Sequence, residues 1–419
     1  MNRNYKTIKS DRVAVQQLID KGVRITSPDS VEIGDDIEPD RISGDNVVIH
    51  AGCRIFGRST LILQGARLGY EGPVTVVDCQ IGPNVRLNGG FFKDAVFLSG
   101  ASAGSGAHVR EGTIFEEEAG IAHSVGLKQT ILFPFVTLGS LINFCDCLMA
   151  GGTDRKNHSE VGSSYIHFNF TPNQDKATAS LMGDVPRGVM LNQSPIFLGG
   201  QGGLVGPCRL EYGTVIAAGT INRKDELRPG RLIFGGRGRG GNVPFAAGQY
   251  HGLKRIMTNN IIYIANLVAL GQWYEQVRRL FVSNDFPQAL LEGLQKIWLM
   301  AVEERIERLG ELMQKIAEQE FDPQDNRSEV HSSQEGFSGC WSELKSFFMG
   351  NLKREGEIAL RDPFLEIISK ELDLKNKHYL TTIKGLSPKS SELGTRWLQG
   401  IVNDVTEGAF QIIPGLNSQ

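Results

Sequence analysis

The sequence predicts an all-β solenoid built from short repeated rungs, followed by an all-α C-terminal domain. Three observations support this prediction. A short apolar residue followed by Gly, Asp, His or Ala recurs at steps of about six residues from Ile33 to about Thr220. Of the 50 glycines, 38 lie in residues 1–252, so the first part of the chain turns often and the second part rarely does. After Gly252 the apolar residues change to the spacing of amphipathic helices.

The repeated motif is typical of a hexapeptide solenoid. A three-sided coil needs one inward apolar side chain on each face, and small residues or glycine where the backbone bends sharply. Each rung is unstable alone and becomes stable by stacking on its neighbours. The clearest rungs are Ile33-Gly34-Asp35-Asp36-Ile37, Ile49-His50-Ala51-Gly52-Cys53, Ile81-Gly82-Pro83-Asn84-Val85, Val161-Gly162-Ser163 and Val215-Ile216-Ala217-Ala218-Gly219-Thr220.

The domain boundaries follow from these patterns. Residues 1–24 carry apolar side chains at the spacing of a short helix, and we expect this segment to cap the open end of the solenoid. The β-helix is expected over residues 25–225, a Gly/Arg-rich linker over 226–250 and a helical domain over 251–419. Polar insertions at 151–160 and 171–176 interrupt the repeat, and insertions in solenoids gather on binding faces.

Composition excludes several classes of partner. The 419-residue chain has a net charge of −3 and no run of Lys and Arg that could neutralise a nucleic acid backbone. No apolar stretch reaches the roughly 18 to 20 residues that span a bilayer, and the N-terminus lacks the apolar core of a signal peptide. We therefore expect a cytoplasmic protein with no nucleic acid or membrane partner. The six cysteines are scattered and suggest neither a metal knuckle nor a redox pair.

The most informative stretch combines an asparagine, a lysine, a threonine and a new rung start. It contains Asn169-Phe170-Thr171-Pro172, Lys176, Thr178 and Met182-Gly183-Asp184, and the later segment Gly213-Thr214-Val215-Ile216-Ala217-Ala218-Gly219-Thr220 follows the same rung pattern. Here the chain resembles the acetyltransferase half of the bifunctional UDP-N-acetylglucosamine pyrophosphorylase/glucosamine-1-phosphate acetyltransferase family. The resemblance spans about residues 31–222 and implies a left-handed β-helix, a homotrimer and an active site between neighbouring subunits. The nucleotide-binding α/β domain of that family is expected to be absent, because nothing before Ile33 fits it.

The resemblance implies that Asn169 and Lys176 contact an amino-sugar phosphate. An ammonium group suits phosphate, and an amide both donates to and accepts from hydroxyl groups. The general base of the family is a histidine one coil upstream, whereas the corresponding stretch here, residues 140–146, contains none. Acyl transfer to an amine needs a base that removes its proton. The nearest substitutes are His158 and His167, whereas His50 and His123 occupy ordinary rung positions.

Three charged residues flank His158 and could assist it. Arg155 and Lys156 could bind a phosphate or the pyrophosphate of coenzyme A, and Asp154 could orient the imidazole, although a solvated loop would have the same composition. Arg237 and Arg239 lie in a glycine-rich segment whose amides and guanidinium groups would suit an anionic cofactor such as acetyl-CoA or another acyl-CoA.

The sequence thus leaves more than one function open. The first is an acyltransferase acting on a sugar phosphate or nucleotide sugar, related to enzymes of UDP-N-acetylglucosamine biosynthesis. The second is a non-catalytic solenoid that binds a nucleotide sugar or serves as a scaffold. A metal enzyme of the carbonic anhydrase type would need three histidines on adjacent rungs, and the uneven spacing of the histidines here leads us to expect no metal.

Overall fold

The computed structural model describes residues 8–235, 252–318, 339–374, 378–413 and 416. Short parallel strands wind into a solenoid with three faces, whose largest sheet has 11 strands. Sheet A contains β1 (Arg24–Ile25), β3 (Val48–Ile49), β6 (Arg67–Leu68), β9 (Arg86–Leu87), β12 (Ser102–Ala103), β15 (Gly120–Ile121), β18 (Thr137–Leu138), β22 (Glu160–Val161), β25 (Phe197–Leu198), β28 (Val215–Ile216) and β30 (Leu232–Ile233).

The other two faces are sheets B and C. Sheet B contains β2 (Glu32–Ile33), β4 (Arg54–Phe56), β7 (Val74–Val77), β10 (Gly90–Lys93), β13 (Ala107–Val109), β16 (Gly126–Leu127), β23 (Ile166–Phe168), β26 (Gly203–Val205) and β29 (Ile221–Asn222). Asn143 forms single bridges to Gly126 and Ile166 and so joins the two parts of this sheet. Sheet C contains β5 (Leu61–Ile62), β8 (Gln80–Ile81), β11 (Ala95–Phe97), β14 (Thr113–Phe115), β17 (Thr130–Leu132), β19 (Cys147–Met149), β24 (Ser180–Met182) and β27 (Arg209–Leu210).

The register stacks like positions of successive coils directly above one another. In sheet A, Leu68 pairs with Leu87, and both side chains are fully buried inside the coil. The residue before each of them, Arg67 or Arg86, points outward and is exposed. This alternation is what a period of two residues produces in each short strand. The predicted fold class, an all-β solenoid followed by a helical region, is confirmed.

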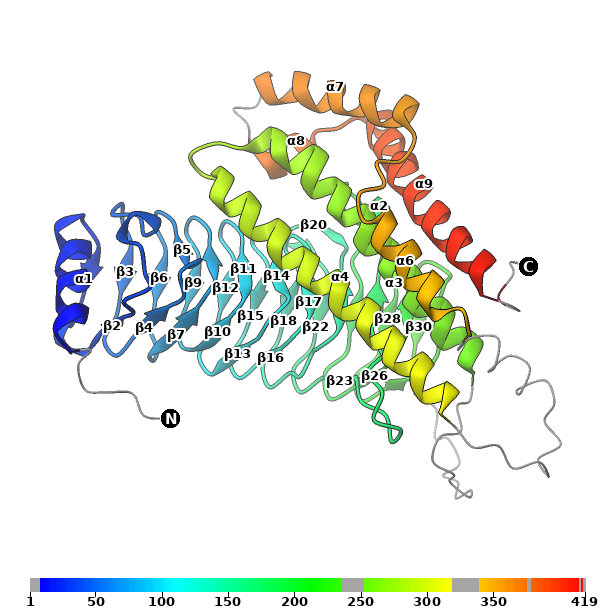
Figure 1. The fold of residues 1–419 in the computed structure, drawn as a ribbon, viewed down its shortest axis with the longest axis horizontal. Helices are drawn as coiled ribbons and strands as arrows, with labels where there is room; N and C mark the ends of the chain where they lie inside the picture. The colour runs from blue at the N-terminus through cyan, green and yellow to red at the C-terminus, as the bar shows by residue number, and fades with distance from the viewer. Residues whose placement is uncertain (1–7, 236–251, 319–338, 375–377, 414–415, 417–419) are drawn as a thin grey trace.

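The solenoid begins under a helix and ends later than the sequence suggested. Helix α1 (Ile8–Asp20) buries Val15 and Leu18 against the first coils, at the blue end of the chain in Figure 1. The predicted linker 226–250 starts inside the solenoid, because β30 (Leu232–Ile233) still pairs with β28. Arg228, Arg231 and the nearby glycines give this segment the composition of a linker, so the sequence does not predict this last rung.

The helical region covers sheet C. Its main elements are α3 (Leu253–Gln272), the π-helix η3 (Trp273–Val277), the 3-10 helix η4 (Arg278–Phe281), α4 (Gln288–Ala317), α6 (Trp341–Asn351), α7 (Ile358–Leu374), α8 (Tyr379–Lys384) and α9 (Pro388–Ile412). Helix α4 contacts β8, β11 and β14 and crosses the solenoid diagonally in Figure 1. Gly293 permits this approach, since a Cβ there would lie 2.4 Å from the Cγ of Gln80.

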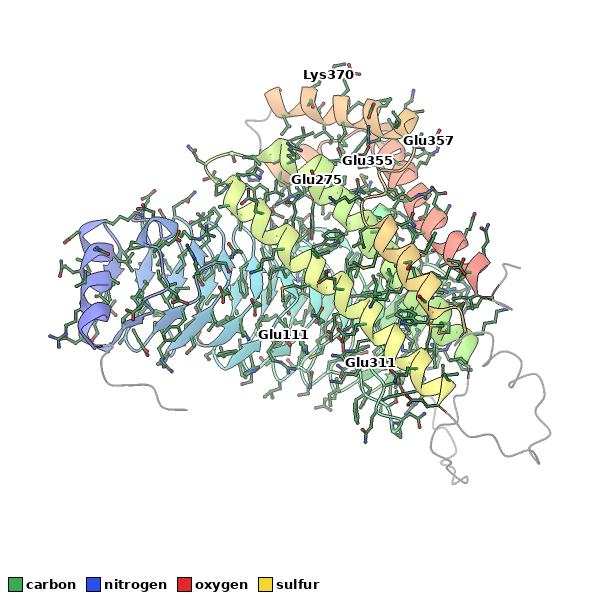
Figure 2. The ribbon with its side chains drawn as sticks, in the orientation of Figure 1. Glu111, Glu275, Glu311, Glu355, Glu357 and Lys370 are labelled. Carbon is green, nitrogen blue, oxygen red and sulfur yellow. The ribbon has the colours of Figure 1, made fainter. Side chains whose placement is uncertain are left out.

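Buried apolar side chains of α3 and α4 belong to the same core as those of the solenoid. In Figure 2, Glu275 marks the π-helix and Glu311 the C-terminal part of α4. Polar contacts add direction to this packing: Asn266 Oδ1 of α3 accepts from the amide of Val185 at the start of the short helix α2 (Val185–Gly188), and Asn260 Nδ2 donates to the carbonyl of Ala177. The segment 169–196 of the solenoid is therefore part of the surface on which the helices rest.

Candidate functional site

The first insertion folds into a β-hairpin. Strands β20 (Gly152–Asp154) and β21 (Asn157–His158) pair antiparallel and project between β19 of sheet C and β22 of sheet A. Gly152 adopts φ 103°, and a Cβ there would lie 2.5 Å from the Cα of His158, so only glycine fits. The hairpin thus stands at the edge where sheets C and A meet.

Arg155 fastens the hairpin to this edge. Its Nη1 donates to the carbonyl oxygens of Glu118 and Phe135, at 3.0 Å each, and to Thr137 Oγ1 at 2.9 Å. Lys156, by contrast, is exposed, and its ammonium makes no hydrogen bond or ion pair with the described residues. Arg155 and Lys156 were both predicted to bind phosphate. Of these two, Lys156 has the charged group that makes no hydrogen bond or ion pair with the described residues and can bind a ligand.

Asp154 does not orient the imidazole as the sequence suggested. Its Oδ1 accepts from the amide of Lys156 at 2.8 Å and its Oδ2 from Thr153 Oγ1 at 3.0 Å, and these bonds lower its pKa. A carboxylate two residues before the amide that it accepts from forms an Asx-turn. The role of Asp154 in the structure is therefore to shape the tip of the hairpin.

His158 is half-buried at the base of the hairpin. Desolvation, followed by the charge of Arg155, lowers its pKa, so its imidazole is neutral near pH 7. Its Nδ1 is buried and has no hydrogen-bond partner among the described residues. A neutral imidazole is the form that can accept a proton from a substrate.

His167 faces the inside of the coil, and its position contradicts the expectation that it serves as a base. The side chain is 1% exposed, with Nδ1 2.7 Å from the carbonyl oxygen of Cys145 and Nε2 2.8 Å from Ser180 Oγ. Burial lowers its pKa to about 4. The alternation along β23 sends Ile166 and Phe168 outward and His167 inward, a register that the sequence did not resolve.

Asn169 and Lys176 lie in the second insertion but differ in availability. Asn169 Nδ2 donates to Asp146 Oδ2 at 2.5 Å, and Asp146 Oδ1 lies 2.7 Å from Nη2 of Arg305 on α4. This buried network ties the insertion to the helical region. Lys176 is exposed, and its ammonium group forms no hydrogen bond or ion pair with the described residues. Lys315 also holds the insertion, by donating to the carbonyls of Asn173 and Gln174.

The two insertions stand on different edges of the solenoid, so they do not form one cleft within a single chain. The hairpin connects sheet C to sheet A, whereas residues 169–179 connect β23 of sheet B to β24 of sheet C. In Figure 1, β20 lies along the upper edge and β23 along the lower edge, with α4 between them. The sequence shows the order of the insertions but not the corner at which each leaves the coil, and the expectation of a cleft between neighbouring chains stays a prediction.

A cavity of about 850 Å³ lies between the solenoid and the helical region. Of the predicted site residues that the structure describes, only Arg155 lines it. The sequence analysis missed the others, which include Arg86, Glu117, Arg278, Phe286 and Tyr379. Arg278 is 1% exposed, pairs with Glu117 and lies under the ring of Tyr379, 3.7 Å from its centroid. No local motif could have shown this cavity, because its walls come from four separate parts of the chain, residues 83–118, 155, 278–286 and 378–380.

Other predicted features lie outside this geometry. Arg237 and Arg239 fall outside the described residues. Within the described residues, no group of three His, Cys, Asp or Glu side chains is placed to hold a metal ion. No helix in the described parts of the chain is both long enough and apolar enough to span a membrane.

Comparisons with known proteins give relatives over half of the chain. No family model matches it. The chain is 27% identical over 212 residues to the bifunctional protein GlmU of Thermotoga petrophila, a match that covers 50% of this chain and 42% of that protein. It is 26% identical over 211 residues to the bifunctional protein GlmU of Pelobacter propionicus, covering 50% and 40%. The chain thus spans less than half the length of these curated relatives.

One solved structure is similar in part. A UDP-N-acetylglucosamine acyltransferase from Campylobacter jejuni aligns at 15% identity, covering 52% of this chain and 71% of that one, with a TM-score of 0.20. The resemblance is confirmed, and the chain is a hexapeptide-repeat solenoid protein similar to bifunctional protein GlmU over half of its length.

Proposed function

We propose that this protein is an acyltransferase that acylates a sugar phosphate or nucleotide sugar from acetyl-CoA or another acyl-CoA, at a site shared by neighbouring copies. The observation that carries the proposal is the pair of polar insertions at the same level of the solenoid, in a chain similar to GlmU. Strands β22 and β23 belong to one coil, the hairpin immediately precedes it and the 169–179 insertion immediately follows it. The two insertions are therefore level along the solenoid axis, although they stand on opposite edges.

Exposed apolar side chains support an assembly that brings these edges together. On sheet A, Phe197, Val215 and Leu232 point outward and are 38–62% exposed, and on sheet B, Ile166 and Ile221 are each 44% exposed. We call these five residues the apolar band. Sheet C is covered by the helices, so sheets A and B are the faces available for association within the described structure. Exposed apolar side chains gathered on two adjoining faces are typical of an interface.

A parallel homotrimer would use the C-terminal coils of sheets A and B, where the apolar band and both insertions lie, and would leave the outward face of the first coils of sheet A free. If sheet A of one copy packs towards sheet B of the next, the contact is heterologous and closes into a ring. The edge of sheet A that adjoins sheet C carries the hairpin, and the edge of sheet B that adjoins sheet C carries the 169–179 insertion. Each cleft between copies would then hold His158 and Lys156 from one copy and Asn169 and Lys176 from its neighbour.

The chemistry in such a cleft follows from the residues available. Neutral His158 would take a proton from the attacking amine as its nitrogen forms a bond to the thioester carbonyl carbon. The carbon–sulfur bond then breaks, and the leaving thiolate recovers a proton, so that an amide and a free thiol result. Lys156 and Lys176, with unpaired ammonium groups, would hold the phosphates of the two substrates. The side-chain oxygen of Asn169 would accept from a sugar hydroxyl, since its nitrogen is bound to Asp146.

Release of free thiol from acetyl-CoA in the presence of glucosamine 1-phosphate tests the proposal. Acceptor-dependent thiol release that falls by 10²-fold or more in His158→Ala is the expected result, since general bases contribute about 10²–10⁴-fold. Release unchanged by this substitution would reject His158 as the base. His123 is a suitable control, because it is exposed on the edge between sheets A and B, where its Nδ1 lies 2.9 Å from Ser140 Oγ.

The second candidate function is a non-catalytic protein that binds a nucleotide sugar. The internal hydrogen bonds of His167 and Asn169 favour it, because they remove one base and one donor from the site. Thermal shift separates the two candidates. A ligand at 100 times its dissociation constant adds about 2.7 kcal/mol of stability. Stabilisation by UDP-N-acetylglucosamine without any thiol release would favour the binding protein, and no response to acetyl-CoA or either sugar would contradict both.

A further inference from the structure

An unpaired row of arginines runs along the N-terminal half of sheet A. The outward positions of successive strands are, in register, Arg24, Val48, Arg67, Arg86, Ser102 and Gly120. All three arginines are exposed. Because neighbouring strands lie about 4.7–4.9 Å apart, the Cα atoms of the paired residues Arg67 and Arg86 are held side by side.

These arginines differ from the exposed arginines of the neighbouring face. On sheet B, Arg54 Nε lies 2.6 Å from Glu32 Oε2, and the turn that follows pairs Arg58 with Glu38 at 3.4 Å. The guanidinium groups of Arg24, Arg67 and Arg86 make no hydrogen bond or ion pair with any described residue. The solenoid therefore supplies carboxylates opposite arginines on one face and omits them on the other.

Two grooves follow the arginine row, and both are rich in hydrogen-bond donors. One, of about 580 Å³, is lined by the three arginines with His50, Tyr70 and Asn88 among others. The other, of about 590 Å³, is lined by the same arginines with Asn46 and Asn84. Neither groove has an Asp or Glu among its described lining residues. The arginines give both grooves a positive charge.

Such a row is unfavourable unless an anion covers it. Like charges at directly paired positions of a sheet destabilise it. Guanidinium groups recognise phosphate through paired hydrogen bonds, and two of them on adjacent strands suit the two phosphates of a diphosphate. Tyr70 is 74% exposed beside this row and lies edge-on to His50, with ring centroids 5.6 Å apart. An exposed ring next to a phosphate site is suited to stacking on a nucleobase.

We propose that this face of sheet A binds the diphosphate group of a nucleotide. Arg67 and Arg86 bind the two phosphates, Arg24 binds a further anionic group of longer ligands, and Tyr70 stacks on the base. The site lies on the first coils, away from both polar insertions, and its occupancy does not require acyl transfer.

Calorimetric titration of the full chain with inorganic pyrophosphate, UDP-N-acetylglucosamine and coenzyme A tests the proposal. We expect saturable binding of pyrophosphate and of at least one of the two nucleotides. The nucleotide that binds shows whether the diphosphate recognised here belongs to a nucleotide sugar or to coenzyme A. The double variant Arg67→Gln/Arg86→Gln should weaken this binding by about tenfold or more, as expected for the loss of at least 1.4 kcal/mol. The matched control Arg54→Gln, whose arginine is already paired, should bind within about twofold of the wild type.

The aromatic contact has its own readout. Tyr70→Ala should weaken binding of the nucleotide and leave the affinity for pyrophosphate unchanged. The double arginine variant should also melt at the same or a higher temperature than the wild type without ligand, because a repulsion is removed, and this excludes misfolding as the cause of lost binding. Absence of binding by all three probes, or equal binding by wild type and the double variant, would overturn the proposal, whatever the outcome of the thiol-release assay.

Discussion

Replacement of Arg305 by methionine should lower the free energy of unfolding by about 3–5 kcal/mol. Arg305 lies on α4 and its side chain is 3% exposed, and it is 2.7 Å from the carboxylate of Asp146, whose side chain is 6% exposed. Methionine keeps most of the packing volume but leaves the Asp146 charge buried, with Asn169 as its remaining side-chain hydrogen-bond donor among the described residues. The large loss is expected because an uncompensated buried charge costs more than the pair contributes.

Urea unfolding with linear extrapolation measures this loss. The control Arg308→Met removes an arginine one turn along the same helix, whose pairs with Glu304 and Glu311 are partly exposed, and it should cost less than about 1 kcal/mol. Adding Asp146→Asn to Arg305→Met should recover part of the loss, since an amide needs no counter-charge and asparagine tolerates the φ of 59° found there. A loss in Arg305→Met no larger than in Arg308→Met would refute the reasoning.

Three further predictions concern pH, burial and assembly. Burial and the charge of Glu117 raise the pKa of Glu116 from its ordinary 4.5 to about 7, so the folded state holds this proton more tightly than the unfolded chain. The stabilisation that protonated Glu116 contributes is complete below pH 4.5 and is lost as the pH rises through 7. The melting temperature of the wild type should therefore fall relative to that of Glu116→Gln between pH 4.5 and 7, and a constant difference between the two would contradict this. His167→Gln should lower the free energy of unfolding in urea by about 1–3 kcal/mol and leave the pH profile of thiol release unchanged. A shifted pH profile would indicate that His167 takes part in the reaction. Phe197→Arg should reduce the molar mass measured by light scattering, and an unchanged mass would exclude the apolar band from the interface.

The fold could be predicted from the sequence because the repeat is encoded residue by residue. Each rung places an apolar side chain inside and a glycine or small residue at the bend, as at Ile81 and Gly82, so the pattern is visible without long-range information. The helices after Gly252 follow from apolar spacing in the same way. The last rung, β30, was missed because Leu232 and Ile233 stand between charged and glycine residues that resemble a linker.

The candidate site could be predicted only in part. The sequence located both insertions, but the role of each side chain depends on one-residue register and on the corner from which each insertion leaves. His167 turns inward because it alternates with Ile166 and Phe168, and Asn169 bonds to Asp146, which the helix bearing Arg305 also contacts. The arginine row was equally hidden, because successive members of the row are 43 and 19 residues apart in the chain and meet only through coil stacking.

The most direct test of a site shared between copies is complementation of two inactive variants. His158→Ala removes the base from the hairpin, and Lys176→Ala removes the cation from the second insertion. If each site takes its hairpin from one copy and its insertion from the neighbour, co-expressed variants should form some intact sites, about one quarter for random mixing in a closed ring. We predict thiol release at about that fraction of wild type from the mixture and almost none from either variant alone. Activity no higher in the mixture than in the separate variants would contradict the shared site.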